Sequence, residues 1–481
     1  MKSLTSLLQA LNQHFMGDNE QVDAVVFDSR QAKEKTLFVA IEGLTNDGHQ
    51  FLEVAFNQGC RFAVVQKEVV CPDGMTLFKV KDTRRALATL ACEWFDHPSQ
   101  QMHLIGVTGT NGKTTTTTLL HQLFSALGFS CGLISTVVNK IEQREIPSTH
   151  TTPDPFAINQ LLRTMVDAGC SYVFMEVSSH AVHQQRIHGL QFAGAVFTNI
   201  THDHLDYHKT FPEYIAAKKG FFDGLSKEAF ALVNIDDRNG AVMLQNCPSK
   251  HATYALNTLA DFKGVVVENS LEGLLVKINH TEVHSKLIGK FNAYNLLAVY
   301  GVGELLGIDK LALFEALSML DSVSGRFQFF KSIHGVTVVV DYAHTPDALE
   351  NVLQTIGQLS NGKNVITLVG CGGDRDKSKR PLMAKIAQKF SQQLILTSDN
   401  PRTENPTQIL REMQEGLEAS SKVPALAIED RKQAILTASL LAKAGDIVLI
   451  AGKGHENYQE VNGVKSPFDD FKIAQEIFNQ N

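Results

Sequence analysis

The sequence of 481 residues predicts an α/β protein with mainly parallel sheets and helices on both faces. Two observations carry this prediction. Short apolar runs alternate with helical patterns over most of the chain, as in βαβ units. Polar motifs follow directly after several apolar runs, where the carboxyl ends of parallel strands meet and ligands bind. At roughly 150 residues per domain, the length indicates about three domains.

Residues 1–99 form the first predicted domain, which is the smallest. Its opening leucines follow the spacing of an amphipathic helix: Leu4, Leu7, Leu8 and Leu11. Polar residues interrupt this stripe and no small-residue cleavage site follows, so a signal peptide is not indicated. Strand-like runs follow at residues 24–27, 36–40 and 62–65. Because no apolar run approaches the ~18 residues of a membrane span, we expect a cytoplasmic protein without membrane insertion.

Composition excludes several classes of protein. Hydrophobic residues make up 43% and charged residues 20%, which is typical of a globular chain. The formal net charge of −7 provides no basic excess for nucleic acid, so no nucleic-acid partner is expected. The 7 cysteines are scattered and form no CxxC pair, which indicates reduced thiols in the cytoplasm. A monomer is expected.

Residues 100–324 and 325–481 form the second and third predicted domains. Expected strands of the second domain cover residues 103–107, 172–177, 194–198 and 229–234, with a helix from Thr114 to a stop at Gly128. Expected strands of the third domain cover residues 337–340, 365–369, 394–397 and 447–451. A polar motif follows each strand. Two such sheet edges facing each other would form an active site between the domains.

A glycine-rich loop, Thr-Gly-Thr-Asn-Gly-Lys-Thr-Thr, occupies residues 108–115 between a predicted strand and a predicted helix. Backbone N–H groups of such a loop can surround a polyphosphate. Lys113 would then contact the β- and γ-phosphates, and Thr114 would bind Mg²⁺. The strict pattern requires glycine at position 107, where this chain has Val107. The alternative is a glycine turn with a surface lysine.

Acidic and imidazole side chains gather after the next two strands. Glu176 ends an apolar strand, where a carboxylate is either a metal ligand or a solvated strand terminus. Several of the 18 histidines lie between residues 180 and 208, and His204 and His208 have the HxxxH spacing of some zinc sites. No HExxH motif is present. With a nucleotide loop in the same domain, magnesium bound by Glu176 and His204 is the simpler hypothesis.

Lys218 stands beside Lys219 in a predicted helix. Spacing alone favours a solvated helix face for such a pair.

Five motifs together resemble those of the Mur ligases: residues 108–115, Met-Glu-Val-Ser-Ser-His, Asp-His-Leu-Asp-Tyr-His, Asp-Tyr-Ala-His-Thr-Pro-Asp-Ala and Gly-Lys-Gly-His-Glu. The resemblance spans essentially the whole chain. It implies an N-terminal domain (1–99) for a uridine nucleotide and a central P-loop-type ATPase domain (100–324). It also implies a Rossmann-like C-terminal domain (325–481) for an incoming amino acid.

The resemblance also implies a reaction and its cofactors, ATP and Mg²⁺. ATP phosphorylates a carboxylate of the substrate, and an amino-acid amine then attacks the acyl phosphate. Lys113, Glu176, His204 and Lys218 match catalytic positions, and Lys218 matches a lysine that is carbamylated. Thr114, Glu176, His204 and Lys218 match the metal site. Nucleotide-contacting positions are Gly109, Thr110, Asn111, Gly112, Lys113, Thr114, Thr115, Asn292, Asn295, Arg326 and Asp341.

For the substrate, the resemblance points to UDP-N-acetylmuramoyl-L-Ala-D-Glu. The matching positions are Phe27, Ser29, Leu44, Thr45, Asn46, His150, Thr151, Thr152, Ser178, Gln184 and Arg186. Two positions depart from the family pattern: His150 replaces an asparagine, and Phe27 replaces a common leucine.

For the amino acid, the turn Asp399-Asn400-Pro401-Arg402 resembles that of family members that add meso-diaminopimelate. This amino acid has one more carboxylate than lysine, and a guanidinium can hold it through two parallel hydrogen bonds. Arg375, Gly452 and Glu456 match the remaining contacts, and Glu456 could hold the distal ammonium. The alternative for Arg402 is an arginine in a surface turn after Pro401.

Three other functions remain possible at this point. A lysine-adding relative lacks the arginine of the turn, and a folylpolyglutamate synthetase lacks the Asp-Asn-Pro-Arg turn and a counterpart of Ser29. A P-loop switch or mechanical ATPase would turn over ATP without an amino-acid acceptor.

Overall fold

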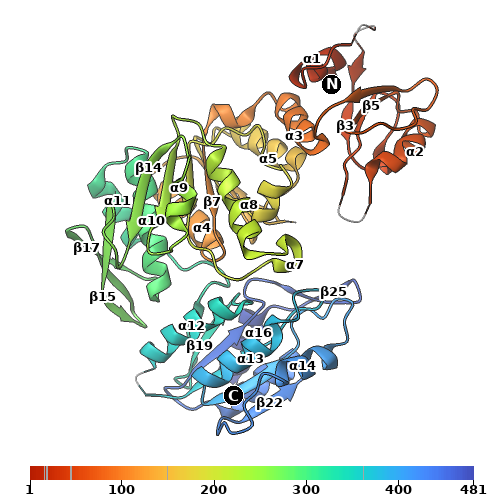
Figure 1. Cartoon of the computed structure of the whole chain (residues 1–481). Coiled ribbons are helices and arrows are strands. Elements are labelled where there is room, and N and C mark those ends of the chain that lie inside the picture. The colour runs from red at the N-terminus through yellow and green to blue at the C-terminus, as the bar shows by residue number, and fades with distance from the viewer. Residues whose placement is uncertain (16, 18–19, 44–45, 149, 361, 481) are drawn as a thin grey trace.

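The computed structural model describes every residue except 16, 18–19, 44–45, 149, 361 and 481. Within the described residues, three larger sheets of four, eleven and six strands form, besides two short two-stranded ribbons. Figure 1 shows the first sheet at the upper right, the second at the centre left and the third below it. Helices cover both faces of each sheet, so the predicted α/β class is confirmed.

The N-terminal sheet is parallel, with strand order β3-β4-β5-β6. Leu37 and Val39 face α1 and α3, whereas Phe38 and Ala40 face α2, as the two-residue repeat of a strand requires. The strands are β1 (Lys2–Ser3), β2 (Gln21–Val22), β3 (Ala24–Val26), β4 (Thr36–Val39), β5 (Phe62–Val65) and β6 (Thr76–Lys79). The helices are α1 (Leu4–Ala10), η1 (Ser29–Gln31), η2 (Gly48–Phe51), α2 (Leu52–Asn57), α3 (Thr83–Trp94) and η3 (Pro98–Gln101).

The central sheet has the order β10-β9-β8-β11-β7-β12-β13-β14-β15-β16-β17 and is parallel from β8 to β15. Helices α4 and α10 cover one face, and α5 and α8 cover the other. Its strands are β7 (His103–Thr108), β8 (Cys131–Ile134), β9 (Val138–Ile141), β10 (Arg144–Pro147), β11 (Tyr172–Glu176), β12 (Gly194–Phe197), β13 (Phe230–Asn234), β14 (Lys250–Ala255), β15 (Phe262–Ser270), β16 (Gly273–Ile278) and β17 (Thr281–Ser285). Its helices are α4 (Lys113–Ala126), α5 (Pro155–Asp167), α6 (Ser179–His183), α7 (Leu205–His208), α8 (Phe211–Asp223), α9 (Gly240–Leu244), α10 (Lys290–Leu305) and α11 (Lys310–Ser318).

The C-terminal sheet has the order β18-β19-β23-β20-β21-β22, and only the edge strand β18 is antiparallel among its described pairings. Helices α12 to α14 pack on one face, and α15 and α16 on the other. The strands are β18 (Gln328–Lys331), β19 (Thr337–Asp341), β20 (Val365–Val369), β21 (Gln393–Thr397), β22 (Ala425–Ile428), β23 (Ile447–Ala451), β24 (Tyr458–Val461) and β25 (Val464–Pro467). The helices are α12 (Pro346–Leu359), α13 (Lys379–Phe390), α14 (Pro406–Gln414), α15 (Arg431–Leu441) and α16 (Asp470–Gln480).

Each strand predicted for the second and third domains is present within one or two residues of its predicted ends. The helix predicted from Thr114 begins one residue earlier, at Lys113, and Gly128 follows its end with a φ of 86°. The parallel strands β8, β14 and β22 were not predicted, nor were β9, β10, β15 to β18, β24 and β25. Most of the latter belong to hairpins, which pair locally without the helix that marks a βαβ unit. No helix in the described part of the chain is long and apolar enough to cross a membrane.

Candidate active site

A cleft of about 880 Å³ lies between the central and C-terminal sheets. On the central side it is lined by the segments that follow β7, β11, β12 and β13. On the C-terminal side it is lined by the segments that follow β19, β20, β21 and β23. The carboxyl ends of two parallel sheets therefore face each other across one cavity, which is where open α/β sheets bind ligands.

The glycine-rich loop joins β7 to α4 at the floor of this cleft. Gly109 has a φ of 155°, and a Cβ atom there would lie 1.9 Å from Oγ1 of Thr198, so no larger residue fits. Gly112 also has a positive φ, of 85°. The ammonium of Lys113 donates to the carbonyl oxygens of Gly109 at 2.8 Å and Thr110 at 2.7 Å. The loop thus holds its lysine against its own backbone at the start of a helix.

The departure at position 107 has a structural reason. Val107 lies within β7, fully buried, and pairs with Val196 of the neighbouring strand. The tight turn begins only at Gly109, after the strand has ended. Glycine at 107 is therefore not needed for the turn, and Asn111, Thr114 and Thr115 still line the cleft.

Lys218 of α8 lies directly below the same loop. Its side chain is only 1% exposed, so the solvated helix face favoured by spacing alone is wrong. The ammonium donates to the carbonyl oxygen of Gly109 at 2.7 Å and lies 4.8 Å from the ring centre of Tyr214. Burial and the nearby charge of Lys113 hold the pKa of Lys218 well below its ordinary value. A larger fraction of the Lys218 side chain is therefore a neutral amine, and the neutral amine is the form that reacts with electrophiles such as CO₂.

Glu176 ends β11 with its side chain inside the cleft wall. The residue is fully buried, and its carboxylate accepts hydrogen bonds from the backbone N–H of Thr136 at 2.7 Å and from its hydroxyl at 3.1 Å. The same hydroxyl contacts that of Thr151 at 3.0 Å. Glu176 is therefore an anchored carboxylate and not a solvated strand terminus.

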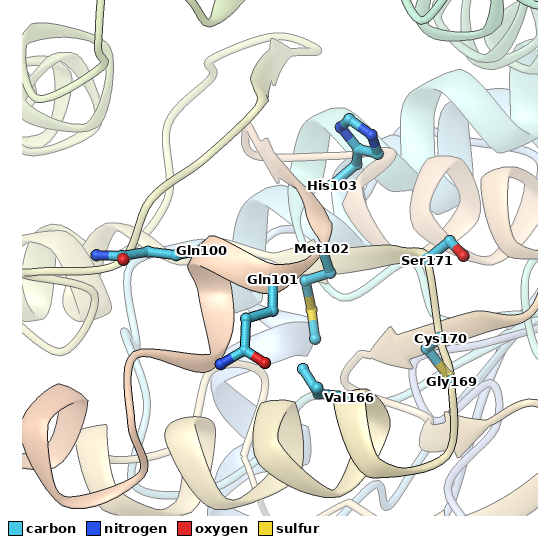
Figure 2. Close-up of a pocket in the computed structure, with 8 residues that line it drawn as sticks. All are labelled: Gln100, Gln101, Met102, His103, Val166, Gly169, Cys170 and Ser171. Carbon is cyan, nitrogen blue, oxygen red and sulfur yellow. The ribbon is translucent and has the colours of Figure 1, made fainter.

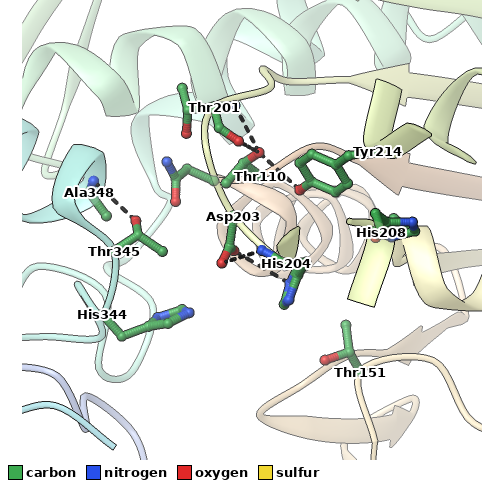
Figure 3. A network of polar contacts seen from close by, with 12 residues as sticks. Thr110, Thr151, Thr201, Asp203, His204, His208, Tyr214, His344, Thr345 and Ala348 are labelled. Carbon is green, nitrogen blue, oxygen red and sulfur yellow. Dashed lines mark hydrogen bonds and ion pairs between the residues drawn. The ribbon is translucent and has the colours of Figure 1, made fainter. Parts of the chain in front are cut away.

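His204 and its neighbour Asp203 lie on the loop before α7, facing the cleft (Figure 3). Nε2 of His204 lies 3.4 Å from a carboxylate oxygen of Asp203. Burial lowers the pKa of His204 to about 4, so the imidazole is neutral at physiological pH and has a lone pair for a cation. His208 points elsewhere, with Nε2 2.9 Å from the hydroxyl of Ser179.

The predicted metal ligands can be compared with what Mg²⁺ requires. Among the residues that the structure describes, no three His, Cys, Asp or Glu side chains gather as a metal-binding group. Zinc sites need such a closed set, whereas Mg²⁺ is usually bound by one or two carboxylates together with phosphate oxygens and water. Glu176, Asp203 and the hydroxyl of Thr114 all line the cleft, and their oxygen donors fit Mg²⁺.

Arg326 and Asp341 are the residues of the C-terminal region that were predicted to contact the nucleotide. The guanidinium of Arg326 donates to the hydroxyl of Thr114 at 3.0 Å and lies 4.5 Å from the ring centre of Tyr342. Asp341 accepts from the backbone N–H of Phe327 at 2.6 Å. Burial raises the pKa of Asp341 to about 6, although Arg326 opposes this. Both predicted residues line the cleft.

The two asparagines of α10 lie at different depths. Asn295 lines the cleft, whereas Asn292 does not. The amide of Asn292 donates to the carbonyl of Ile288 at 2.8 Å, and its oxygen accepts from the amide of Asn295 at 2.9 Å. Asn292 therefore orients Asn295, and its predicted direct contact with nucleotide is not supported by this geometry.

The predicted dipeptide-binding residues form one wall. Those lining the cleft are His150, Thr151, Thr152, Ser178 and Arg186. Arg186 donates to the carbonyl of Thr152 at 2.7 Å. Gln184 lies outside the lining and accepts from Arg186 at 2.8 Å. Gln184 thus fixes the guanidinium and does not itself face the cavity.

The predicted uridine-binding residues lie apart from this cleft. Phe27, Ser29 and Asn46 belong to the N-terminal region, and none of them lines the cavity. Phe27 is 42% exposed. Leu44 and Thr45 lie outside the described residues. The structure therefore does not bring these positions together with the others, and Figure 1 shows the N-terminal sheet apart from the region between the central and C-terminal sheets.

The predicted amino-acid contacts form the opposite wall. Those lining the cleft are Arg375, Asp399, Arg402, Gly452 and Glu456. Arg402 has a φ of 52°, and its guanidinium donates to the carbonyl of Gly373 at 2.7 Å. Asn400 and Pro401 do not line the cavity, and the amide of Asn400 donates to Glu456 at 2.7 Å.

The sequence analysis missed three residues at the walls of the cleft. Asp347 of α12 accepts from the amide of Asn111 at 2.8 Å and from the hydroxyl of Thr201 at 3.3 Å, across the two domains. Asp203 lies beside His204, and Lys453 contacts Glu456. Each belongs to a motif already singled out, so its position inside the motif was the available signal.

A second, more open pocket of about 440 Å³ lies near the amino ends of β7 and β11 (Figure 2). Its lining includes Gln101, Met102, His103 and Cys170. None of the predicted site residues is part of it. The chemistry-bearing side chains therefore belong to the cleft between the sheets.

Comparison with known proteins agrees with this geometry. Residues 107–303 match the model of the Mur ligase middle domain, and residues 325–454 match that of the Mur ligase glutamate ligase domain. A protein of Cytophaga hutchinsonii named UDP-N-acetylmuramoyl-L-alanyl-D-glutamate–2,6-diaminopimelate ligase is 52% identical over 460 residues, covering 95% of both chains. A protein of the same name from Bacteroides thetaiotaomicron is 50% identical and covers 99% of this chain and 100% of its own.

Solved structures give the same result. A structure with that enzyme name superposes with a TM-score of 0.70 at 32% identity, covering 99% of both chains. A crystal structure of MurF from Acinetobacter baumannii superposes with a TM-score of 0.66 at 17% identity, over 99% of both chains, which supports the fold alone. From the two domain matches and the near full-length relatives, this chain belongs to the Mur ligase family.

Proposed function

We propose that this protein is an ATP-dependent ligase that adds meso-diaminopimelate to UDP-N-acetylmuramoyl-L-alanyl-D-glutamate, in the synthesis of the peptidoglycan precursor. The observation that carries the proposal is that one cleft joins a phosphate-binding loop to a wall with Arg402 and Glu456. The names of relatives at 50–52% identity support the same reaction.

In the first step, a carboxylate oxygen of the substrate attacks the γ-phosphorus of ATP, and ADP leaves. Lys113 and the N–H groups of the loop hold the phosphates and neutralise charge as it moves. Thr114, Glu176 and His204 would hold Mg²⁺, which would neutralise phosphate charge. The low pKa of Lys218 supports carbamylation, which would replace a buried cation by a carboxylate-like ligand.

In the second step, the neutral amine of the amino acid attacks the acyl carbon. A tetrahedral intermediate forms, phosphate leaves, and the new amide nitrogen loses a proton. Thr151, Thr152, Ser178 and Arg186 would hold the dipeptide end so that its carboxylate lies between the loop and the opposite wall.

On the opposite wall, we propose that Arg402 binds the distal carboxylate and Glu456 the distal ammonium of meso-diaminopimelate. Lysine lacks that carboxylate, so it would leave the guanidinium unpaired, and such a site rejects the smaller analogue. We further propose that residues 1–99 bind the uridine end, residues 100–324 bind ATP and residues 325–481 bind the amino acid.

The test is phosphate release by purified protein with ATP, Mg²⁺ and the UDP-dipeptide, in parallel with meso-diaminopimelate, L-lysine and no acceptor. We expect release with diaminopimelate alone. Release with lysine would leave the ligase intact but remove Arg402 as the selector. Equal release without acceptor would overturn the ligase and indicate an uncoupled ATPase.

A further inference from the structure

Lys453 is a buried lysine on the acceptor wall with a complete set of partners. Its side chain is 0% exposed. The ammonium contacts Oδ1 of Asn400 at 3.0 Å, Oε2 of Glu456 at 3.2 Å and the carbonyl oxygen of Tyr458 at 2.6 Å. A lysine has three N–H donors, so these acceptors use all of them. Lys453 does not line the cleft and has no donor left for a ligand.

These contacts join two segments of the chain, because Lys453, Glu456 and Tyr458 lie close together in sequence and Asn400 lies 53 residues before Lys453. Asn400 belongs to the turn after β21, Glu456 to the turn after β23, and Tyr458 begins the β24–β25 hairpin. The hairpin also holds the turn through its backbone, because the N–H of Arg402 donates to the carbonyl of Glu460 at 3.0 Å. Lys453 therefore links the turn after β21 to the turn after β23, and these two turns form the acceptor wall.

The contacts of Asn400 determine how Glu456 is presented. Oδ1 of Asn400 accepts from Lys453 and from the backbone N–H of Glu460 at 2.9 Å, so its amide nitrogen must face Glu456. That nitrogen donates to Oε2 of Glu456 at 2.7 Å, the same oxygen that Lys453 contacts. Both of these hydrogen bonds go to Oε2, Oε1 accepts none from the described residues, and Glu456 lines the cleft. One carboxylate oxygen is thus bound and the other is available to a ligand.

We propose that Lys453 is a positioning residue for acceptor recognition, which holds Glu456 with Oε1 directed to the ammonium of the incoming amino acid. This inference rests on the proposed function, because it assigns a role within the acceptor site of that ligase. On this proposal the acceptor wall has two parts. Arg402 binds a carboxylate of the amino acid, and the Lys453–Glu456 pair binds its ammonium.

Charge supports the same role. Burial and the neighbouring Asp399 raise the pKa of Glu456, and Lys453 opposes them. Arg431 and Tyr342 are further ionisable groups that interact with this carboxylate. Without Lys453, Glu456 would remain buried beside Asp399 and would take up a proton more readily. A protonated Glu456 cannot pair with an ammonium, so binding of the acceptor would improve as the pH rises through the new pKa.

The experiment compares wild type, Lys453→Met and Lys385→Met in acceptor-dependent phosphate release between pH 7 and 9. Lys385 is a matched control, because it pairs with Glu418 on the surface and is 59% exposed. We expect Lys453→Met to raise the KM for diaminopimelate roughly 10-fold or more, because a charged hydrogen-bond partner is lost. The KM for ATP should not change, and the defect should shrink as the pH rises. Lys385→Met should behave as wild type.

The results separate the two proposals. A wild type that releases no phosphate with diaminopimelate would overturn the proposed function. An active wild type, with an unchanged KM for diaminopimelate in Lys453→Met, would overturn the role of Lys453 alone.

A second set of variants covers the case in which Lys453→Met does not fold. Replacing both partners of a buried ion pair avoids an unpaired charge, so Lys453→Met/Glu456→Gln is compared with Glu456→Gln. We expect equal KM values for diaminopimelate, because Lys453 acts through Glu456. A further 10-fold rise in the double variant would contradict the proposal.

Discussion

The two ends of the cleft each contain a buried lysine, and the two lysines have opposite surroundings. Lys218 donates to the carbonyl oxygen of Gly109 and has the cation Lys113 nearby. Lys453 contacts Asn400, the carbonyl of Tyr458 and the carboxylate of Glu456. At Lys218, burial and the neighbouring cation Lys113 outweigh the charge of Asp203 and lower the pKa, which favours a neutral amine, whereas three acceptors hold the amino group of Lys453. Burial alone therefore does not say what a lysine does.

This difference matches the tasks of the two ends. At the nucleotide end, the phosphates of ATP bring negative charge, and Lys113 and Arg326 line the cleft there as cations. At the acceptor end, the ligand carries both charges, and the wall offers Arg402 and Glu456, each held by the protein itself. The nucleotide end therefore needs its ligands to balance its charges, whereas the side chains of the acceptor end are already held in place by the protein.

The largest expected effect comes from Lys113→Met, which breaks the nucleotide end alone. Loss of a preorganised group that stabilises phosphate charge should lower kcat roughly 10²–10³-fold. The KM for diaminopimelate should change little, because Lys113 contacts the glycine loop and not the acceptor wall. Steady-state phosphate release measures both constants. The control is Lys310→Met, which removes a surface lysine that is 65% exposed; an equal loss there would contradict the assignment.

The next prediction sets the two buried lysines against each other in stability. Lys453→Met leaves Glu456 buried without its cation, so it should lower the free energy of unfolding by about 3–5 kcal/mol. Lys218→Met should raise the melting temperature at neutral pH, because it removes a cation that folding must strip of water and leaves Gly109 bonded to Lys113. Thermal unfolding in CO₂-depleted buffer measures both.

The effect of Lys218 on the stability of the protein should depend on pH in a defined direction. The folded pKa of Lys218 lies below its unfolded value, so the unfolded chain binds more protons and stability rises with pH up to the ordinary lysine range. The advantage of Lys218→Met should therefore shrink as the pH rises towards 10.5. Destabilisation by both variants would show that the two lysines are alike.

A smaller effect is expected at the acceptor end from Arg402→Lys. Lysine cannot form two parallel hydrogen bonds to a carboxylate, so kcat/KM for diaminopimelate should fall about 10-fold. The KM for ATP should stay the same, since Arg402 lies on the wall opposite the loop. Arg411→Lys on the exposed side of α14 is the matched control. Unchanged kinetics in Arg402→Lys would mean that another residue binds the distal carboxylate.

The smallest expected effect concerns Asp341, where the two domains meet. Burial raises its folded pKa to about 6 from 3.8, so the folded chain binds more protons than the unfolded chain between these values. Stability should therefore fall as the pH rises through this window. Asp341→Asn should flatten that slope by at most one proton, measured by urea unfolding at pH 4 to 6.5. A slope identical to that of wild type would remove Asp341 from the account.

Much of the architecture could be predicted because the signals are local. The strand before residue 109 and the helix predicted from Thr114 follow from apolar runs and glycine placement, and both are present, the helix beginning at Lys113. The polar motifs after the strands mark the two sheet edges. The resemblance named residues on both walls of the cleft because these stand inside short motifs.

The remaining features depend on long-range contacts. Lys218 looks like a surface residue in its helix and is buried only because α8 packs under the loop after β7. Lys453 stands between glycines, and its contact with Asn400 comes from a distant segment, the turn after β21. Phe27 and Ser29 lie outside the cleft. The sequence could not predict this, because neither residue determines where the whole N-terminal domain is placed.

The most direct measurement follows oxygen from the substrate carboxylate. The UDP-dipeptide is prepared with ¹⁸O in the free carboxylates of its D-glutamyl residue and is turned over with ATP, Mg²⁺ and meso-diaminopimelate. If both ends of the cleft act on one acyl phosphate, each released phosphate carries one ¹⁸O atom, as mass spectrometry would show. Phosphate without ¹⁸O would mean that water, and not the carboxylate, receives the phosphoryl group, which would contradict the account.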